Sequence, residues 1–156
     1  TSMKQFLKVH QLAMQLDTLL QKYCSDIFSL GLRGFVAWQF LKSALSKLDD
    51  WSSTISLFQE EYQVPLLSPE LAAYAGTGAE LVFASLLLLG LFSRLSAFGL
   101  LLVNVMAVAS YPILWNLECP AALNDHFYWG MLLLALMIFG AGKLSVDHLL
   151  VRTYQK

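Results

Sequence analysis

Long apolar stretches separated by short polar connections dominate the chain after residue 26. The four stretches run over about 27–48, 71–92, 95–111 and 127–142. A helix needs roughly 20 apolar residues to cross a bilayer, and only the last stretch is clearly shorter. The pattern predicts an all-α membrane protein, an up-down antiparallel four-helix bundle.

The segment 4–26 has a helical pattern instead of a continuous apolar run. Its lysines and glutamines lie largely off the apolar face, which predicts an amphipathic helix. Such a helix either lies on the membrane surface or binds a cytosolic partner, and the pattern favours neither. Residues 1–3 are expected to be a cloning remnant and the native start. The apolar face comprises Val9, Leu12, Ala13, Leu16, Leu20 and Tyr23.

Composition agrees with membrane insertion. The chain is 57% hydrophobic and 13% charged, with a mean hydropathy of +0.58. Soluble domains carry about 25% charged residues, so a soluble core does not explain these values. A net charge of −1 gives no indication of nucleic-acid binding. Two cysteines without a CxxC motif are too few for a disulfide framework or a zinc site.

Basic residues predict how the chain crosses the membrane. They precede the first stretch, separate the second and third, and follow the fourth, whereas 49–70 and 113–126 contain none. Because cytoplasmic connections are enriched in Lys and Arg, both termini are expected to be cytoplasmic. Cys24 and Cys119 then lie on opposite sides, which excludes a disulfide within one chain.

Two capping signals flank the connection 49–70. Asp49 and Asp50 predict the start of a short helix whose apolar stripe ends near Tyr62. Ser68, followed by a proline, predicts the start of the second spanning helix.

Glu80 is the one charged residue inside the second span. A carboxylate at this depth costs roughly 2.5–3.5 kcal/mol on insertion scales and therefore needs a partner. The small residues of 72–79 predict that it faces a tight helix contact. Lys42 in the first span is its expected counter-ion, extended by Asn104 and Gln39. The group is either a clasp that holds the helices in register or a polar pocket for a quinone head group, a small solute or a proton.

Three aromatic or titratable residues open the fourth span at the outer interface: His126, Tyr128 and Trp129. They indicate either an ordinary aromatic belt or an apolar slot with hydrogen-bonding groups that suits a quinone.

Two arginines lie near span ends. Arg33 is expected to extend to the lipid headgroups. Arg94, in a very short cytoplasmic turn, is expected to set topology and contact lipid phosphate, with a salt bridge to Asp147 as the alternative.

Four motifs resemble the DoxX family of small four-span membrane proteins. They are FQEEYQVP at 58–65, LAA at 71–73 followed by Glu80, LLGLFSRLSA at 88–97 and GAGKLSVD at 140–147. The resemblance covers about 27–150. It implies a four-helix membrane bundle. It also implies a link to redox or oxidative-stress complexes, or to sulfur oxidation through a thiosulfate:quinone oxidoreductase.

These observations favour a non-catalytic membrane subunit or anchor of a redox complex, in a bacterial inner membrane. Enzyme activity stays open, because the chain shows no self-contained catalytic motif and no intrinsic cofactor or metal site; a quinone is the implied ligand. Its expected partners are the lipid bilayer and either further copies or a redox subunit. The alternatives are a small-solute or proton-handling protein that uses Lys42 and Glu80, and an anchor that recruits a soluble partner through 4–26.

Overall fold

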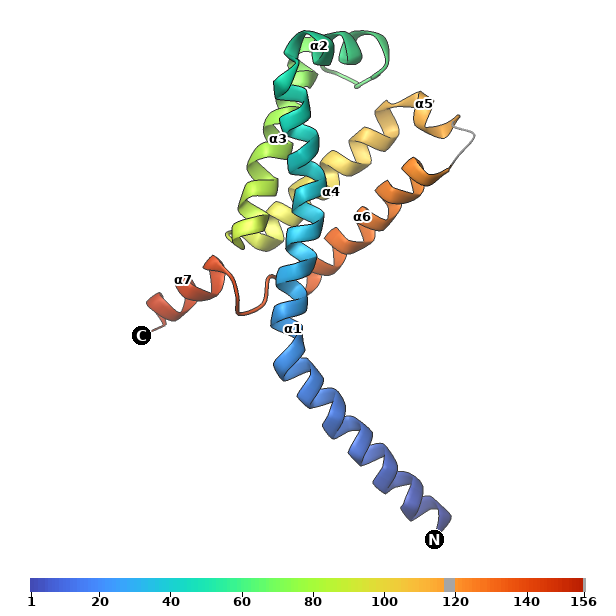
Figure 1. Ribbon diagram of the computed structural model, residues 1–156, viewed down its shortest axis with the longest axis vertical. Coiled ribbons are helices and arrows are strands. Elements are labelled where there is room, and N and C mark those ends of the chain that lie inside the picture. The colour runs from blue at the N-terminus through green and yellow to red at the C-terminus, as the bar shows by residue number, and fades with distance from the viewer. Residues whose placement is uncertain (117–119, 156) are drawn as a thin grey trace.

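The computed structural model describes residues 1–116 and 120–155, and all regular structure within these ranges is helical (Figure 1). Cys119, used above for the sidedness of the chain, and Lys156, one of the basic residues after the fourth stretch, lie outside the described residues. The helices are α1 (Ser2–Asp49), α2 (Trp51–Glu60), α3 (Pro69–Leu89), α4 (Ser93–Ser110), α5 (Pro112–Trp115), α6 (Ala121–Phe139) and α7 (Val146–Tyr154).

The amphipathic segment and the first predicted span form one helix. α1 runs for 48 residues, about 72 Å at 1.5 Å per residue, with no break at the predicted boundary near residue 26. No proline interrupts this stretch. In Figure 1 the N-terminal half of α1 stands clear of the other helices, and residues 1–25 are all exposed.

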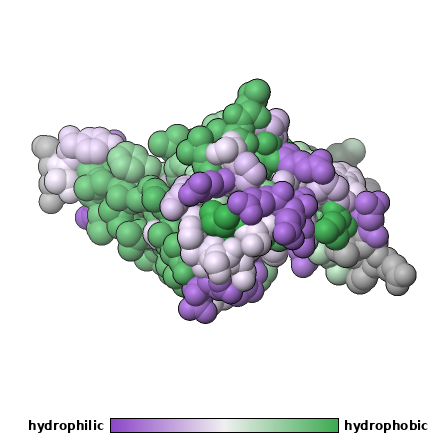
Figure 2. Space-filling model, turned by 90° about the horizontal axis from the view of Figure 1, so that it is seen from above, coloured by the Kyte–Doolittle hydropathy of each residue, from purple (hydrophilic) through white to green (hydrophobic). Residues whose placement is uncertain are grey.

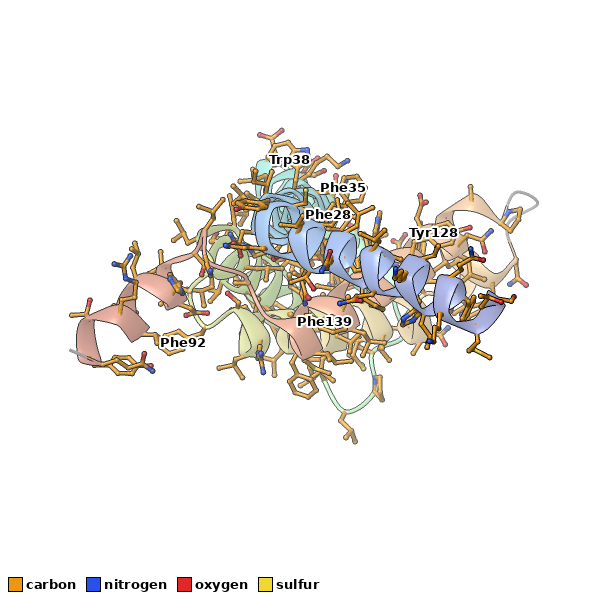
Figure 3. All side chains as sticks on the ribbon, turned by 90° about the horizontal axis from the view of Figure 1, so that it is seen from below. Phe28, Phe35, Trp38, Phe92, Tyr128 and Phe139 are labelled. Carbon is orange, nitrogen blue, oxygen red and sulfur yellow. The ribbon has the colours of Figure 1, made fainter. Side chains whose placement is uncertain are left out.

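α1, α3, α4 and α6 share one apolar core. α1 lies beside α3, and α4 lies beside α6 (Figure 1). The core residues are Val36, Ala37, Phe40, Ala84, Leu87, Ala97, Leu100, Leu133 and Leu136. Many large apolar side chains point away from this core, and Figure 3 shows Phe28, Phe35, Trp38 and Phe139 among them. An apolar outer surface is what a bilayer requires.

Among the described residues, three helices, α3, α4 and α6, are long and apolar enough to cross a membrane. α6 begins at Ala121, six residues before the predicted span, because the helix includes the polar side chains of 124–126 that hydropathy excludes. It is therefore longer than predicted. α1 falls outside this group because its bundle half carries three basic residues.

α2 covers one end of the bundle. Phe58 packs on Ala72 and Ala73 of α3, while hydrophilic side chains gather over the centre of this end (Figure 2). Both predicted caps are confirmed. Asp50 accepts a hydrogen bond from the Ser53 backbone N–H at 3.1 Å, and Ser68 accepts one from that of Leu71 at 3.2 Å.

Arg33 is fully buried, so the prediction that it reaches the headgroups is wrong. Its guanidinium donates to the carbonyls of Leu87 at 3.4 Å and Leu88 at 3.5 Å, and to that of Leu144. Backbone carbonyls in the last turn of α3 lie at the depth of Arg33, so both terminal nitrogens of its guanidinium are hydrogen-bonded inside the protein, whereas Nε has no hydrogen-bond partner among the described residues. Gly90 follows with φ +74°, where a Cβ would clash with this guanidinium.

Asp147 fastens the C-terminal segment to α4. Its carboxylate accepts from the backbone N–H groups of Phe92 at 2.7 Å and Ser93 at 2.8 Å. The alternative salt bridge to Arg94 is not formed: within the described ranges the one ion pair joins Lys47 and Glu80. Lipid contact by the exposed Arg94 stays a prediction.

Candidate functional site

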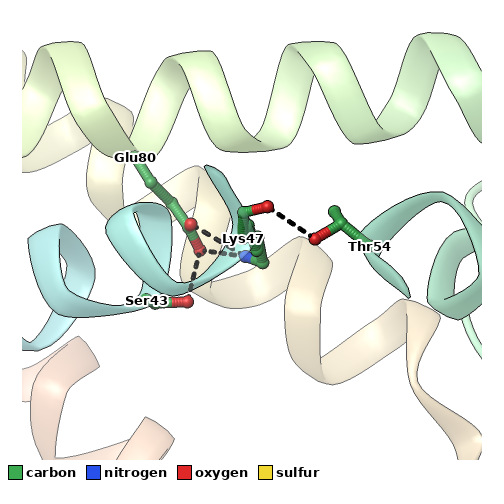
Figure 4. A network of polar contacts seen from close by, with 4 residues as sticks. All are labelled: Ser43, Lys47, Thr54 and Glu80. Carbon is green, nitrogen blue, oxygen red and sulfur yellow. Dashed lines mark hydrogen bonds and ion pairs between the residues drawn. The ribbon is translucent and has the colours of Figure 1, made fainter. Parts of the chain in front are cut away.

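Glu80 of α3 pairs with Lys47 in the last turn of α1 (Figure 4). The Lys47 ammonium donates to both carboxylate oxygens, at 2.9 and 2.8 Å, and the Ser43 hydroxyl donates to one of them at 3.4 Å. Only 6% of Glu80 is exposed. The Thr54 hydroxyl of α2 donates to the backbone carbonyl of Lys47 at 2.8 Å, which holds the turn next to the pair.

The predicted pairing of Glu80 with Lys42 is therefore wrong. Lys42 is exposed, and its ammonium donates to Gln39 at 3.3 Å. Five residues separate Lys42 from Lys47, which is about 140° around a helix at 3.6 residues per turn, so the two cannot face the same neighbour. The face of α1 that enters the bundle carries Phe40 and Lys47, and a seven-residue spacing from Phe40 could have identified Lys47.

Asn104 does not extend this ion pair; it joins α4 to α6. Its side-chain amide donates to the backbone carbonyl of His126 at 2.7 Å, and its Oδ1 lies 2.8 Å from His126 Nδ1. With the amide assigned this way, Oδ1 only accepts, so Nδ1 carries the proton.

The three residues predicted at the outer interface, His126, Tyr128 and Trp129, do not lie on one side of α6. His126 contacts Trp129 edge to face at 4.9 Å between ring centroids, and Trp129 contacts Phe40 of α1 at 5.9 Å. Tyr128 is exposed on the outside of the bundle (Figure 3). His126 and Asn104 also line a wide groove between α4 and α6 whose remaining wall is mostly apolar.

A cavity of about 200 Å³ lies between α2, α3 and α4, with the Lys47–Glu80 pair in its wall. Apart from this pair its lining is mostly apolar, including Ala79 and Met106. Ser110 lies at the α5 end of α4, is 1% exposed, and its hydroxyl has no hydrogen-bond partner in the part of the chain that the structure describes.

Aromatic rings close the cavity on the α2 side. Tyr62 stacks on Phe58 at 4.6 Å and on Tyr111 at 4.9 Å between ring centroids, and the Tyr111 hydroxyl donates to Glu61 at 2.8 Å. Burial, and then the negative charge of Glu80, raise the pKa of Tyr62 to about 12. Tyr62 is therefore a neutral phenol in the physiological range, and its hydroxyl keeps its proton as a hydrogen-bond donor.

The arrangement is suited to binding. It places the Lys47 ammonium, Tyr62, Ser110 and an apolar wall around a space for one small group. Across 1–116 and 120–155, no three His, Cys, Asp or Glu side chains converge as a metal-holding group. The sequence indicated Glu80 but missed Lys47, Tyr62 and Ser110. The aromatic stripe that begins in α2 could have indicated Tyr62, because aromatic side chains that do not face lipid pack over other parts of the protein.

Comparison with known proteins relates the chain to one family. The family model described as DoxX matches residues 28–112, which include Lys47, Glu80 and Asn104. A protein of Haemophilus influenzae described as uncharacterized is 32% identical over 147 residues, covering 88% of this chain and 93% of that protein. No solved structure matches the chain significantly.

Proposed function

The chain belongs to the DoxX family of membrane proteins, and on this basis we propose that it is the non-catalytic membrane subunit of a redox complex. In this proposal it holds a quinone head group in the cavity beside Lys47 and Glu80. The observation that carries the proposal is a buried ion pair in the wall of an otherwise mostly apolar cavity.

The ion pair has capacity left for a ligand. An ammonium has three N–H donors, and Glu80 accepts two contacts from Lys47, which leaves one donor for the cavity. If the pair served only as a helix clasp, a closely packed contact would be sufficient and no cavity would be needed beside it.

A quinone head group matches this chemistry. Its ring is apolar and its carbonyl oxygens accept hydrogen bonds, which Lys47, Tyr62 and Ser110 are able to donate. Small-molecule pockets usually measure about 300–1,000 Å³, so a cavity of about 200 Å³ suits the head group alone. The isoprenoid tail would then extend between the helices into lipid.

The redox centre is proposed to belong to a partner subunit. The chain would position the quinone near that centre and separate it from water. Purification of the complex from its native membrane tests this part, because a partner with a flavin, iron–sulfur cluster or haem is expected to copurify.

α1 is proposed as a fourth span, with both termini on the cytoplasmic side of a bacterial inner membrane. Arg33 and Lys47 are the basic groups of α1 that face the bundle, and both are paired inside the protein. This pairing lowers the cost of placing them in a bilayer. The ends of α1 and α7 lie away from the α2 end (Figure 1), in agreement with the distribution of Lys and Arg.

Quinone binding is tested with the protein reconstituted in nanodiscs. Extraction and mass spectrometry identify any copurified quinone, and titration with a short-chain ubiquinone and a short-chain menaquinone measures affinity. Lys47→Met removes the donor and Ala107→Leu fills the cavity, so both are expected to weaken binding by at least about tenfold, or 1.4 kcal/mol.

Lys42→Met is the matched control, because it removes an exposed lysine of the same helix outside the cavity. It is expected to bind quinone as the unaltered protein does. The proposal is overturned if neither quinone binds, or if Lys42→Met and Lys47→Met weaken binding equally.

Proton or small-solute handling is the second candidate, because the carboxylate of Glu80 lies within a spanning helix beside a cavity. In liposomes, this function predicts a flux that Glu80→Gln abolishes while the protein stays folded. A quinone-binding subunit predicts no such flux.

A further inference from the structure

The projecting half of α1 carries an apolar seam with a seven-residue repeat. Apolar residues occupy both the first and fourth positions of every heptad across 6–30, and all of them are exposed. A repeat sustained over more than three heptads is typical of a helix that packs against another helix. The seam comprises Phe6, Val9, Ala13, Leu16, Leu20, Tyr23, Ile27 and Leu30.

Two glycines continue this seam into the bundle half of α1. At 3.6 residues per turn, Gly31 and Gly34 follow Ile27 on the same side of the helix. A Cβ on either glycine would meet no atom within 4 Å, so packing within the chain does not require glycine there. Small residues at such positions allow a second membrane helix to approach closely.

The seam lies on the side of α1 that faces away from the bundle. Arg33 and Phe40 mark the bundle side, and helical geometry places Ile27 and Gly34 more than 90° around the axis from them. Figure 3 shows Trp38 on this outer side of α1 as well. A partner could therefore pack along α1 without displacing any other helix.

We propose that the outer face of α1, from Phe6 to Gly34, binds the same face of a second copy, as a parallel coiled coil that continues into the membrane. Copies inserted with the same topology present their α1 helices in parallel, which this pairing needs. The inference is independent of the proposed quinone site, which lies on the opposite side of α1.

The continuous helix disfavours the membrane surface as the occupant of this seam. α1 is helical without a break from residue 2 to 49, and although it bends where it leaves the bundle, its N-terminal half extends beyond the bundle (Figure 1). A flat bilayer also does not require a seven-residue repeat, whereas a helical partner does.

Charges beside the seam permit a parallel pair. In a parallel coiled coil the seventh position of one heptad faces the fifth position of the partner's next heptad. None of these facing pairs carries like charges. They are Gln5 with His10, Leu12 with Asp17, Leu19 with Cys24, and Asp26 with Gly31.

Cysteine cross-linking in native membranes tests the seam. In a background with Cys24→Ser and Cys119→Ser, Leu16→Cys and Ile27→Cys place thiols on the seam, and Thr18→Cys places one on the polar face. Mild oxidation is expected to shift both seam variants to twice the monomer mass and to leave Thr18→Cys at the monomer mass. Equal cross-linking at all three positions overturns the proposal.

A larger side chain at Gly34 tests the part of the proposed helix pair that lies in the membrane. Gly34→Leu, combined with Leu16→Cys, is expected to reduce the dimer by at least about tenfold, the loss expected when a small-residue contact is blocked. Gly78→Leu is the matched control on α3, because a Cβ at Gly78 also meets no atom within 4 Å. If Gly34→Leu leaves the amount of dimer unchanged, the proposed contact at Gly31 and Gly34 is overturned. If the Leu16→Cys variant stays monomeric and its thiol does not react with an aqueous maleimide, the proposed coiled coil is overturned, because residues 6–30 then lie in lipid.

Discussion

Arg33 and Lys47 show how single charged residues are accommodated in this apolar protein. Both lie on the bundle face of α1 and bond to groups of other segments: the terminal nitrogens of Arg33 bond to backbone carbonyls and Lys47 bonds to Glu80. Lys42 faces outward and has only its helical neighbour Gln39. The direction of a side chain around the helix therefore decides whether its charge organises the bundle.

Removal of the Lys47 charge is expected to destabilise the fold strongly. Lys47→Met leaves Glu80 buried without a counter-ion, which should cost about 3–5 kcal/mol of unfolding free energy. The double variant Lys47→Met/Glu80→Met should recover most of this loss, because no charge remains unpaired. Unfolding titrations in mixed detergent micelles measure both values.

Lys42→Met is the control, and its unfolding free energy should stay within about 0.5 kcal/mol of that of the unaltered protein. The assigned pairing would be contradicted if Lys42→Met were as destabilising as Lys47→Met.

Arg33 is expected to resist replacement even by lysine. Arg33→Lys keeps the charge but loses the planar fork that reaches carbonyls of both α3 and the segment before α7. Loss of these hydrogen bonds should cost about 1–3 kcal/mol. Thermal unfolding in detergent measures the effect, and Arg94→Lys, at an exposed arginine, is the control. Equal melting temperatures for the two variants would show that the buried fork is not needed.

At the scale of the elements, helix ends explain the motifs that resemble the DoxX family. Gly90 ends α3 in a left-handed conformation, Asp147 caps the first turn of α4, and Ser145 caps α7 by accepting from His148. The motifs 88–97 and 140–147 thus meet at one end of the bundle. Their shared role is to satisfy backbone groups that would otherwise be unpaired near lipid.

α2 should become less stable in acid. Hydrogen bonds from the Ser53 side chain, then its backbone N–H, and from the Ser52 side chain lower the pKa of Asp50 below its ordinary value of 3.8. Because the folded pKa is depressed, the cap is fully stabilising above pH 3.8 and is lost as the pH falls through the lower folded pKa.

Amide hydrogen exchange of 51–60, corrected for its intrinsic pH dependence, measures this effect. We expect constant protection between pH 7 and 5 and faster exchange only below 3.8. Asp50→Asn should remove the change with pH. A loss of protection already near neutral pH would assign it to a different group.

At the scale of the whole molecule, α2 and α5 lie at one end and the two termini lie away from it (Figure 1). This separation agrees with a distribution of Lys and Arg that leaves 49–70 and 113–126 without a basic residue. The proposed orientation therefore makes a direct statement about which residues are reachable from each side of the membrane.

Thiol labelling in intact cells tests that orientation. In a Cys119→Ser background, a membrane-impermeant maleimide should label Ser56→Cys on the exposed side of α2 from outside. It should label the native Cys24, also exposed, only after permeabilisation. Labelling of Cys24 in intact cells would reverse the proposed topology.

Much of the molecule could be predicted from local sequence. The helices, their caps at Asp50 and Ser68, and the need of Glu80 for a cation follow from hydropathy, capping residues and the cost of a buried charge. The predictions that were wrong concern direction. Lys42 and Arg33 were assigned to the wrong surroundings because a single helix does not reveal which of its faces its neighbours cover.

The sequence by itself determined that this chain is helical, belongs in a membrane and must pair a carboxylate inside it. Those properties depend on hydropathy summed over 20 residues and on charge, and both can be read along the chain. Only the tertiary structure decided that Lys47 meets Glu80, that Asn104 binds His126 and that a cavity remains beside the ion pair. Such contacts depend on the rotation and depth of each helix, and these are set jointly by the packing of all the helices.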